Sequence, residues 1–518
     1  MTCRKTARHA SAPDILRRLV RRAAIGTRRL DVRCPTDFRR ENLHIQEVQW
    51  RPARREHAEG EVPRLSHVAT YENLTCRRFP APSPQIDERI RIRNAPPPPG
   101  EGITDVLIYL YIITFPALSM LVRGGASALL IGGSVLALIG LFFVPRPRQV
   151  LTRADWTFLA SMAAPVVLVV ATELSHGEIV WNTIDSPSRF LLAIPLYLLM
   201  RRHARPMRSL HLAFMAGAIA SILIMVPNHR EWGADRFGSY FLNPIHYGDI
   251  ALIFGVLSAL SVCWGRRDHW LLAAVKISGL IAGLLASLLT GSRGGWVALP
   301  LLAILVLVYQ YRNRTWRFKM LVALGVAAAC VLPYAASPFI RDRIDDVKTD
   351  IQHYREGQRD TSVGVRLQLW EAGLSFVRDN PFTGLGGGGY KRNMPELQAS
   401  GALTPLAAQA GEGEMHNQMI AYAVDYGLIG WLALMLVYCG PAAIFACSLR
   451  SSDSTVQRAA LLGLAFVLAF WMFGLTVETF NLKSTTSTYS GILAMLCAYC
   501  AASRHSATDG QQMPDRTT

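Results

Sequence analysis

Long apolar stretches separated by short polar segments dominate the chain from Ile103 onward. An α-helix needs about 20 residues to cross a hydrocarbon core of roughly 30 Å, and most of these stretches reach that length. Backbone inside a bilayer must satisfy its own hydrogen bonds, so each stretch is predicted to be a helix. The predicted spans are 103–122, 126–144, 155–173, 188–200, 207–227, 244–264, 270–290, 294–311, 318–336, 418–447, 459–478 and 486–502. The fourth could begin earlier, near Trp181, and the tenth could include a turn at its outer end.

The distribution of Lys and Arg between the short loops orients these twelve spans. Cytoplasmic loops are richer in both residues. With the N-terminus inside, the five inner loops hold fifteen Lys and Arg, and the five short outer segments hold six. The sequence therefore predicts an all-α integral membrane protein whose one long loop, residues 337–415, is periplasmic.

This long loop is predicted to be rich in helix. Residues 365–377 place Leu369, Gly373 and Phe376 on one helical face, and Asn380-Pro381 follows as a stop signal. Loops of this length without structure of their own are uncommon unless they are functional.

Composition separates a first segment from the membrane domain. Residues 1–102 contain twenty Arg and one Lys against twelve acidic residues, in a chain of net charge +17 that is 51% hydrophobic. We expect a basic tail at 1–102, a membrane domain at 103–503 and a cytoplasmic tail at 504–518. Three interpretations of the first segment stay open: a tail on anionic lipid, a regulatory arm, or translation from an upstream start codon, which is preferred.

Two arginines at the predicted outer surface are candidate ligand-binding residues. Arg293 lies in TGSRGGW between the seventh and eighth spans, where the glycines allow a tight turn and close approach of a ligand. Arg366 begins the predicted helix of the long loop, where the helix dipole would favour an anion instead. The alternatives are an arginine that reaches the headgroups at 293 and a solvated arginine at 366.

His416, in the sequence EMHNQ where the long loop returns to the membrane, is the candidate general base. It is expected in the first turn of the next helix, whose positive end favours a neutral imidazole. A purely structural histidine is the alternative. Arg236 and His246 flank the start of the sixth span at Asn243-Pro244, and Asp249 could pair with either of them.

Several arginines around one histidine predict a site for a diphosphate group. The planar guanidinium donates two hydrogen bonds at once and stays charged. No cluster of acidic or Cys/His residues with metal-ligand spacing accompanies them in the sequence, so neither a metal nor a cofactor is expected.

Three stretches, in order, resemble the O-antigen ligase and polymerase superfamily of bacterial envelope glycosyltransferases. They are the SRGGW turn, the Arg366-x-x-x-Trp370 helix that leads into Asn380-Pro381-x-x-Gly384-x-Gly386, and His416-Asn417 continuing into DYGLIGWL. Residues 236–244 are similar to a weaker family feature. The resemblance covers about residues 103–503.

The resemblance implies the all-helical, lipid-carrier type of membrane glycosyltransferase fold in the bacterial inner membrane, with a metal-independent, inverting transfer. The donor would be a glycan on undecaprenyl diphosphate and the acceptor lipid A–core or another glycan, with no nucleic-acid partner. By similarity, His416 would deprotonate the acceptor, and Arg293 and Arg366, with Arg236 as a further contact, would bind the diphosphate. Many ligases have a second histidine just before the His-Asn pair, where this chain has Gly413, Glu414 and Met415.

The acceptor is open among three possibilities within this class. An O-antigen ligase is preferred, a polymerase of O-antigen or exopolysaccharide repeat units is the main alternative, and a protein O-oligosaccharyltransferase is less favoured. A transporter is the competing class. Transporters usually carry ionisable groups near the middle of the membrane. In this chain the polar candidates lie at the outer ends of the spans and only Lys276 is predicted deep within one, which disfavours a transporter.

Overall fold

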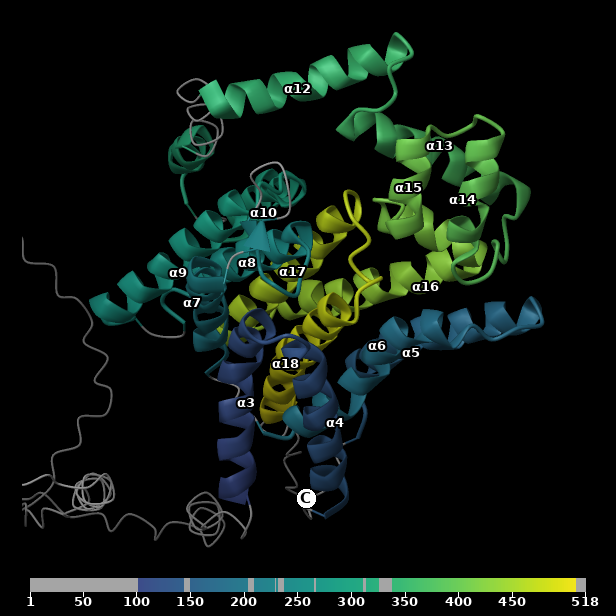
Figure 1. The fold of residues 1–518 in the computed structure, drawn as a ribbon. Helices are drawn as coiled ribbons and strands as arrows, with labels where there is room; N and C mark the ends of the chain where they lie inside the picture. The colour runs from purple at the N-terminus through teal and green to yellow at the C-terminus, as the bar shows by residue number, and fades with distance from the viewer. Residues whose placement is uncertain are drawn as a thin grey trace, which may run out of the picture. The chain divides into compact units, whose positions relative to one another are not determined.

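The computed structural model describes residues 101–143, 150–203, 209–228, 230–231, 237–264, 267–310, 314–325 and 338–508. These residues belong to one compact unit (Figure 1). Its helices are α3 Glu101–Leu121, α4 Gly125–Phe143, α5 Arg153–Ser175, α6 Trp181–Met200, α7 Leu210–Asn228, α8 Pro244–Leu260, α9 Trp270–Leu289, the 3₁₀ turn η2 Gly294–Val297, α10 Ala298–Gln310, α12 Pro338–Arg355, α13 Ser362–Asp379, α14 Gly389–Ala399, α15 Pro405–Gly413, α16 Gln418–Ser448, α17 Ser454–Gly474 and α18 Lys483–Thr508.

Six of the described helices are long and apolar enough to cross a membrane: α3, α4, α5, α9, α16 and α17. Three shorter apolar helices run over 210–225, 244–260 and 294–309. The chain is therefore a multi-pass helical membrane protein, whereas the number of twelve spans stays a prediction. The expected span 318–336 lies mostly outside the described residues.

Several predicted boundaries are confirmed. α6 begins at Trp181, and α8 begins at Pro244 with the Asn243 side chain accepting the N–H of Ile245 at 2.9 Å. The tenth span contains a break at Gly427, where φ is +61°. One element was not predicted, a two-residue antiparallel pairing of β1 (Arg230–Glu231) with β2 (Phe237–Gly238).

The largest core surrounds α18. From Tyr489 to Ala501 this helix is buried on all sides, and it packs against α3, α4, α5, α6, α16 and α17 (Figure 1). By contrast, α4 exposes one face of large apolar side chains, which include Val135, Leu136 and Phe142. Such a face is stable against lipid and unfavourable against water.

A second, smaller core lies in the long loop. α13, α14, α15 and the start of α16 share buried side chains that include Leu369, Tyr390, Met394 and Met415. The predicted helix 365–377 is confirmed as the middle of α13, which ends at Asp379 with Asn380 as its C-cap. The long loop is therefore a packed helical subdomain.

Candidate active site

The turn that carries Arg293 packs too closely on its neighbours to admit side chains at its glycines. A Cβ atom on Gly294 would lie 2.4 Å from Thr476 Oγ1, and one on Gly295 would lie 2.4 Å from Asp249 Oδ1. Gly291, at φ +63°, turns the chain after α9. These glycines let the turn settle between α8 and the loop that follows α17, with Arg293 directly before η2.

Arg366 lies in the second turn of α13 rather than at its first residue. The helix is capped by Thr361, whose side chain accepts the N–H of Gly364 at 3.1 Å. Side chains on a helix lean toward its N-terminus, and the Arg366 guanidinium follows this rule. It donates to the carbonyl oxygen and the hydroxyl of Ser362 at 3.1 and 3.0 Å.

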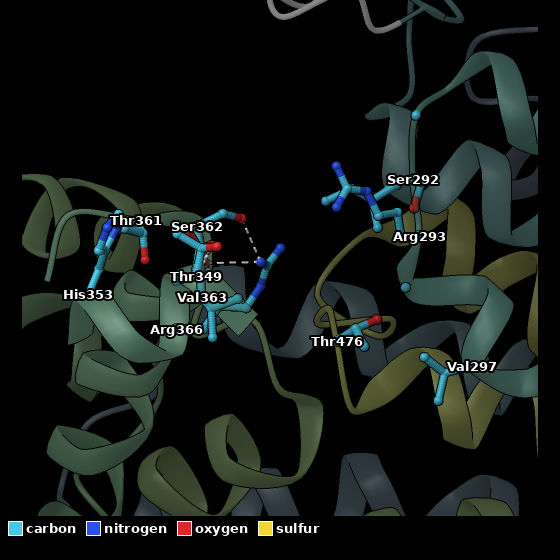
Figure 2. Close-up of a pocket in the computed structure, with 14 residues that line it drawn as sticks. Ser292, Arg293, Val297, Thr349, His353, Thr361, Ser362, Val363, Arg366 and Thr476 are labelled. Atoms are coloured by element: carbon cyan, nitrogen blue, oxygen red, sulfur yellow. Dashed lines mark hydrogen bonds between the residues drawn. The ribbon is translucent and has the colours of Figure 1, made fainter. Parts of the chain in front are cut away.

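Arg293 and Arg366 line one cavity of about 680 Å³ and point into it from opposite walls (Figure 2). Its lining residues come from α8, the turn after α9, α12, the start of α13 and the loop after α17: Ile245, Gly291, Ser292, Arg293, Gly294, Val297, Thr349, Asp350, His353, Thr361, Ser362, Val363, Arg366 and Thr476. The structure thus brings together two of the residues that the sequence singled out.

The cavity is suited to an anion. Two arginines line it, and the first turn of α13 adds the partial positive charge of a helix N-terminus, although its N–H groups at Val363 and Gly364 already donate to Asp350 and Thr361. Among the described lining residues the only carboxylate is Asp350, and it accepts the N–H of Val363 at 3.2 Å. The buried hydroxyl of Ser292 has no hydrogen-bond partner within the described part of the chain, so it is available to a ligand.

His416 does not line this cavity. The expectation that it lies in the first helical turn is wrong: α16 begins at Gln418, and Asn417 is its cap, accepting the N–H groups of Met419 and Ile420. His416 precedes the cap with a left-handed φ of +56°. Asn417 takes the cap because its short side chain can reach those donors.

One turn of α13 connects the cavity with the histidine. Arg366 and Trp370 are four residues apart and therefore neighbours on the helix surface. The indole N–H of Trp370 donates to the carbonyl oxygen of Met415 at 3.2 Å, one residue before His416. The histidine backbone is thus held by the same stretch of helix that carries Arg366.

The loop between α17 and α18 makes a second connection. Thr476 lines the cavity, and two residues later the N–H of Glu478 donates to Glu414 Oε2 at 3.3 Å. Consecutive Cα atoms are about 3.8 Å apart, so the Cα atoms of Thr476 and Glu478 are at most about 7.6 Å apart. The residue that contacts Glu414 is therefore close to the cavity wall.

A carboxylate lies directly against the candidate base. His416 Nδ1 is 2.9 Å from Glu414 Oε1, and the two side chains are only 19% and 15% exposed. Burial alone would raise the pKa of Glu414, but His416 and His246 together hold it below its usual value. At neutral pH Glu414 is ionised.

Glu478 is the acidic residue of this region that the sequence analysis missed. Its carboxyl accepts the Tyr390 hydroxyl at 2.8 Å and the N–H of Met415. Burial, followed by the charge of Glu414, raises the pKa of Glu478 to about 8. The one available signal was a single acid in the otherwise apolar and hydroxylic run 475–480.

Arg236 and Lys276 are two other charged residues for which the sequence predicts a role or a position. Arg236 lies outside the described residues, so its role stays a prediction. Lys276 lies in the second turn of α9, where its ammonium reaches back to Asp268 at 2.7 Å and to the carbonyl oxygen of Ser261 at 2.8 Å. Its charge is therefore near the end of the helix and not at the midplane.

Comparisons with known proteins point in the same direction as the geometry. Residues 277–435 match a family model described as O-Antigen ligase. An uncharacterized protein of Haemophilus influenzae is 26% identical over 375 residues, which cover 70% of this chain and 91% of that protein. A protein of Escherichia coli K12 named O-antigen ligase is 21% identical over 187 residues, covering 36% of this chain and 44% of the relative.

The family model spans both Arg293 and Arg366, together with α13 to α15 and His416. The resemblance seen in the sequence motifs is thereby confirmed. Over residues 277–435, this chain is similar to the O-antigen ligase family.

Proposed function

We propose that this protein is an O-antigen ligase that transfers a glycan from undecaprenyl diphosphate to lipid A–core on the periplasmic side of the bacterial inner membrane. The observation that carries the proposal is the cavity that contains Arg293, Arg366 and the N-terminus of α13. Arginine binds phosphate oxygens with paired, charge-assisted hydrogen bonds, and the dipole of α13 adds positive potential.

In the proposed reaction, the hydroxyl oxygen of the acceptor sugar attacks the anomeric carbon of the donor. The bond between that carbon and the diphosphate oxygen breaks, and the lipid diphosphate leaves with the bonding electrons. Attack from the opposite side inverts the configuration. His416 takes the hydroxyl proton, a role that contributes typically 10²–10⁴-fold to a rate.

Arg293 and Arg366 would stabilise the charge that develops on the leaving diphosphate. Cations that are fixed before the reaction need no reorganisation as that charge appears, so they favour the transition state. Because arginines supply this positive charge, we expect transfer to continue in EDTA.

The proposal can be tested with membranes, a lipid-linked glycan donor and lipid A–core. His416→Ala and Arg293→Ala should each lower the transfer rate by about 10²-fold or more with normal insertion into the membrane. Arg378→Ala, an exposed arginine at the far end of α13, is the matched control and should transfer normally. A wild-type rate in either site variant would refute the assigned role.

The ligase and the polymerase release the same lipid diphosphate, so the residues of the site do not distinguish them. A gene deletion does, because the two losses leave different products. On electrophoresis of lipopolysaccharide, loss of a ligase leaves free core while polymer accumulates on the lipid carrier. Loss of a polymerase leaves core that bears a single repeat unit. The relative named O-antigen ligase favours the first outcome.

A further inference from the structure

A carboxylate two residues earlier in the chain lies against the His416 ring. Glu414 Oε1 lies 2.9 Å from Nδ1 and so within hydrogen-bonding distance of that nitrogen. A carboxylate at this position favours the tautomer with its proton on Nδ1. The lone pair that can accept a proton is then on Nε2.

Glu414 is itself held by a reciprocal pair of contacts with the loop after α17. Its Oε2 accepts the N–H of Glu478, and the Glu478 carboxyl accepts the N–H of Met415. The Tyr390 hydroxyl donates to the same Glu478 oxygen. These contacts hold the Glu414 carboxylate and the backbone of Met415, directly before His416, whose left-handed conformation is costly for a residue other than glycine.

We infer that Glu414 is the positioning residue of the general base, orienting His416 so that Nε2 faces the acceptor hydroxyl and stabilising the imidazolium that forms. The inference deepens the proposed function and rests on it. Neither the family match nor the names of the relatives assigns a role to Glu414.

The proton balance of this arrangement is complete. As the new glycosidic bond forms, the acceptor O–H bond breaks and its proton moves to Nε2 of His416. The imidazolium is then paired with the Glu414 carboxylate, and the proton passes to solvent after the product leaves. Glu414 keeps its negative charge throughout, as does the buried acid of a Ser-His-Asp triad.

The surrounding charges leave one anion beside the imidazole at neutral pH. Glu414 is ionised, whereas Glu478 retains a proton up to about pH 8 because it is buried near that charge. Lys391 donates to the carbonyl oxygen of Gly413 at 2.7 Å, and its charge also acts on Glu478. The charge of Glu414 also interacts with His246 and Asp249 of α8 and with Tyr390 of α14. Two neighbouring carboxyl groups with pKa values shifted in opposite directions suit one charged and one neutral role.

The test compares the kcat–pH profiles of Glu414→Gln and Glu414→Asp with the wild-type profile. Gln keeps the size of Glu and removes its charge, so kcat should fall about 10²-fold or more, with an unchanged KM for the donor. The acidic limb of the profile should move to lower pH, because the anion that stabilises the imidazolium is gone. Asp withdraws the carboxylate by one methylene group and should give a kcat between those of the other two proteins.

The matched control is Glu412→Gln, at an exposed position on α15 two residues upstream, which should keep the wild-type kcat and profile. A Glu414→Gln protein with wild-type kcat and an unshifted acidic limb would overturn the inference, provided that His416→Ala is inactive. If Gln prevents insertion, an Asp variant that matches the wild type in kcat and profile would overturn it as well. Undiminished transfer by His416→Ala would instead refute the proposed function.

Discussion

Glu478 shows how burial sets the charge of a single residue. It lies between α17 and α18, only 4% exposed, and its pKa is raised to about 8. From about pH 4.5 to about pH 8 the folded protein therefore holds a proton that the unfolded chain has released. The state that binds more protons is disfavoured as pH rises, so this group lowers the free energy of unfolding across that window.

Glu478→Gln should remove this loss of stability. The amide oxygen can still accept from Tyr390 and Met415, and an amide does not ionise. The melting temperature in detergent should match the wild type near pH 5, exceed it increasingly up to about pH 8, and differ by a constant amount above that pH. Parallel melting curves for the two proteins over this range would contradict the neutral state of Glu478, and Glu412→Gln serves as a control on the surface.

Arg366→Lys tests whether the cavity requires the shape of arginine or only its charge. Lysine keeps the charge but loses the planar fork that binds two oxygens at once. We expect kcat/KM for the lipid-linked donor to fall about 10-fold or more. Arg378→Lys, on the same helix, should have no effect. Equal kcat/KM values for Arg366→Lys and the wild type would mean that this arginine does not hold the diphosphate.

At the scale of elements, the glycine-rich segment 384–389 joins the helical subdomain of the long loop to two membrane helices. The N–H of Gly387 donates to Glu173 of α5 at 2.8 Å, and the N–H groups of Gly388 and Tyr390 donate to Asp425 of α16 at 3.0 and 3.2 Å. Because carboxylates occupy these donors, the segment is an anchor for α14 and not a phosphate-binding loop.

At the break in α16, backbone N–H groups that the helix leaves without a partner donate to the segment that follows α13. At Gly427 the helix leaves its regular path, and the N–H groups of Leu428 and Ile429 donate to the carbonyl oxygens of Pro381 and Phe382. The motif after Asn380 and the motif DYGLIGWL are therefore one structural unit. Their joint appearance in the sequence reflects this contact as much as any chemistry.

Gly384→Ala should disrupt this unit. Gly384 has a φ of +65°, and a Cβ atom would lie 2.4 Å from the carbonyl oxygen of Val424, which cannot move aside. We expect a loss of stability of at least about 1–3 kcal/mol. Limited proteolysis between residues 338 and 413 and the melting temperature measure the effect. Gly401→Ala, at φ +75° with open space around it, isolates the cost of the backbone alone and should be milder.

Local signals in the sequence predicted most of the helices but few of the contacts that form the site. The start of α8 at Asn243-Pro244 and the end of α13 at Asn380 followed from capping and proline rules, because these depend on adjacent residues. The contact between Glu414 and Glu478 joins residues that are 64 positions apart, so no local periodicity in the sequence predicts it. The contribution of α12 to the cavity was missed for the same reason.

At the scale of the whole molecule, the distribution of Lys and Arg predicts which face of the membrane carries the site. Ser400→Cys, at an exposed position after α14, should react with a membrane-impermeant maleimide in intact spheroplasts when the native cysteines are replaced. Ser452→Cys, in the short exposed connection between α16 and α17, should react only after permeabilisation. The reverse pattern would place the cavity in the cytoplasm and exclude a periplasmic transfer.

The burial of α18 has a consequence for biogenesis. This helix is synthesised after all the helices that it packs against, yet it is enclosed by them from Tyr489 to Ala501. The earlier helices therefore lie in the lipid with an unfilled interior until α18 has been inserted. A nascent chain that stops before Tyr489 would thus be an incomplete assembly, which quality-control proteases could recognise in the membrane.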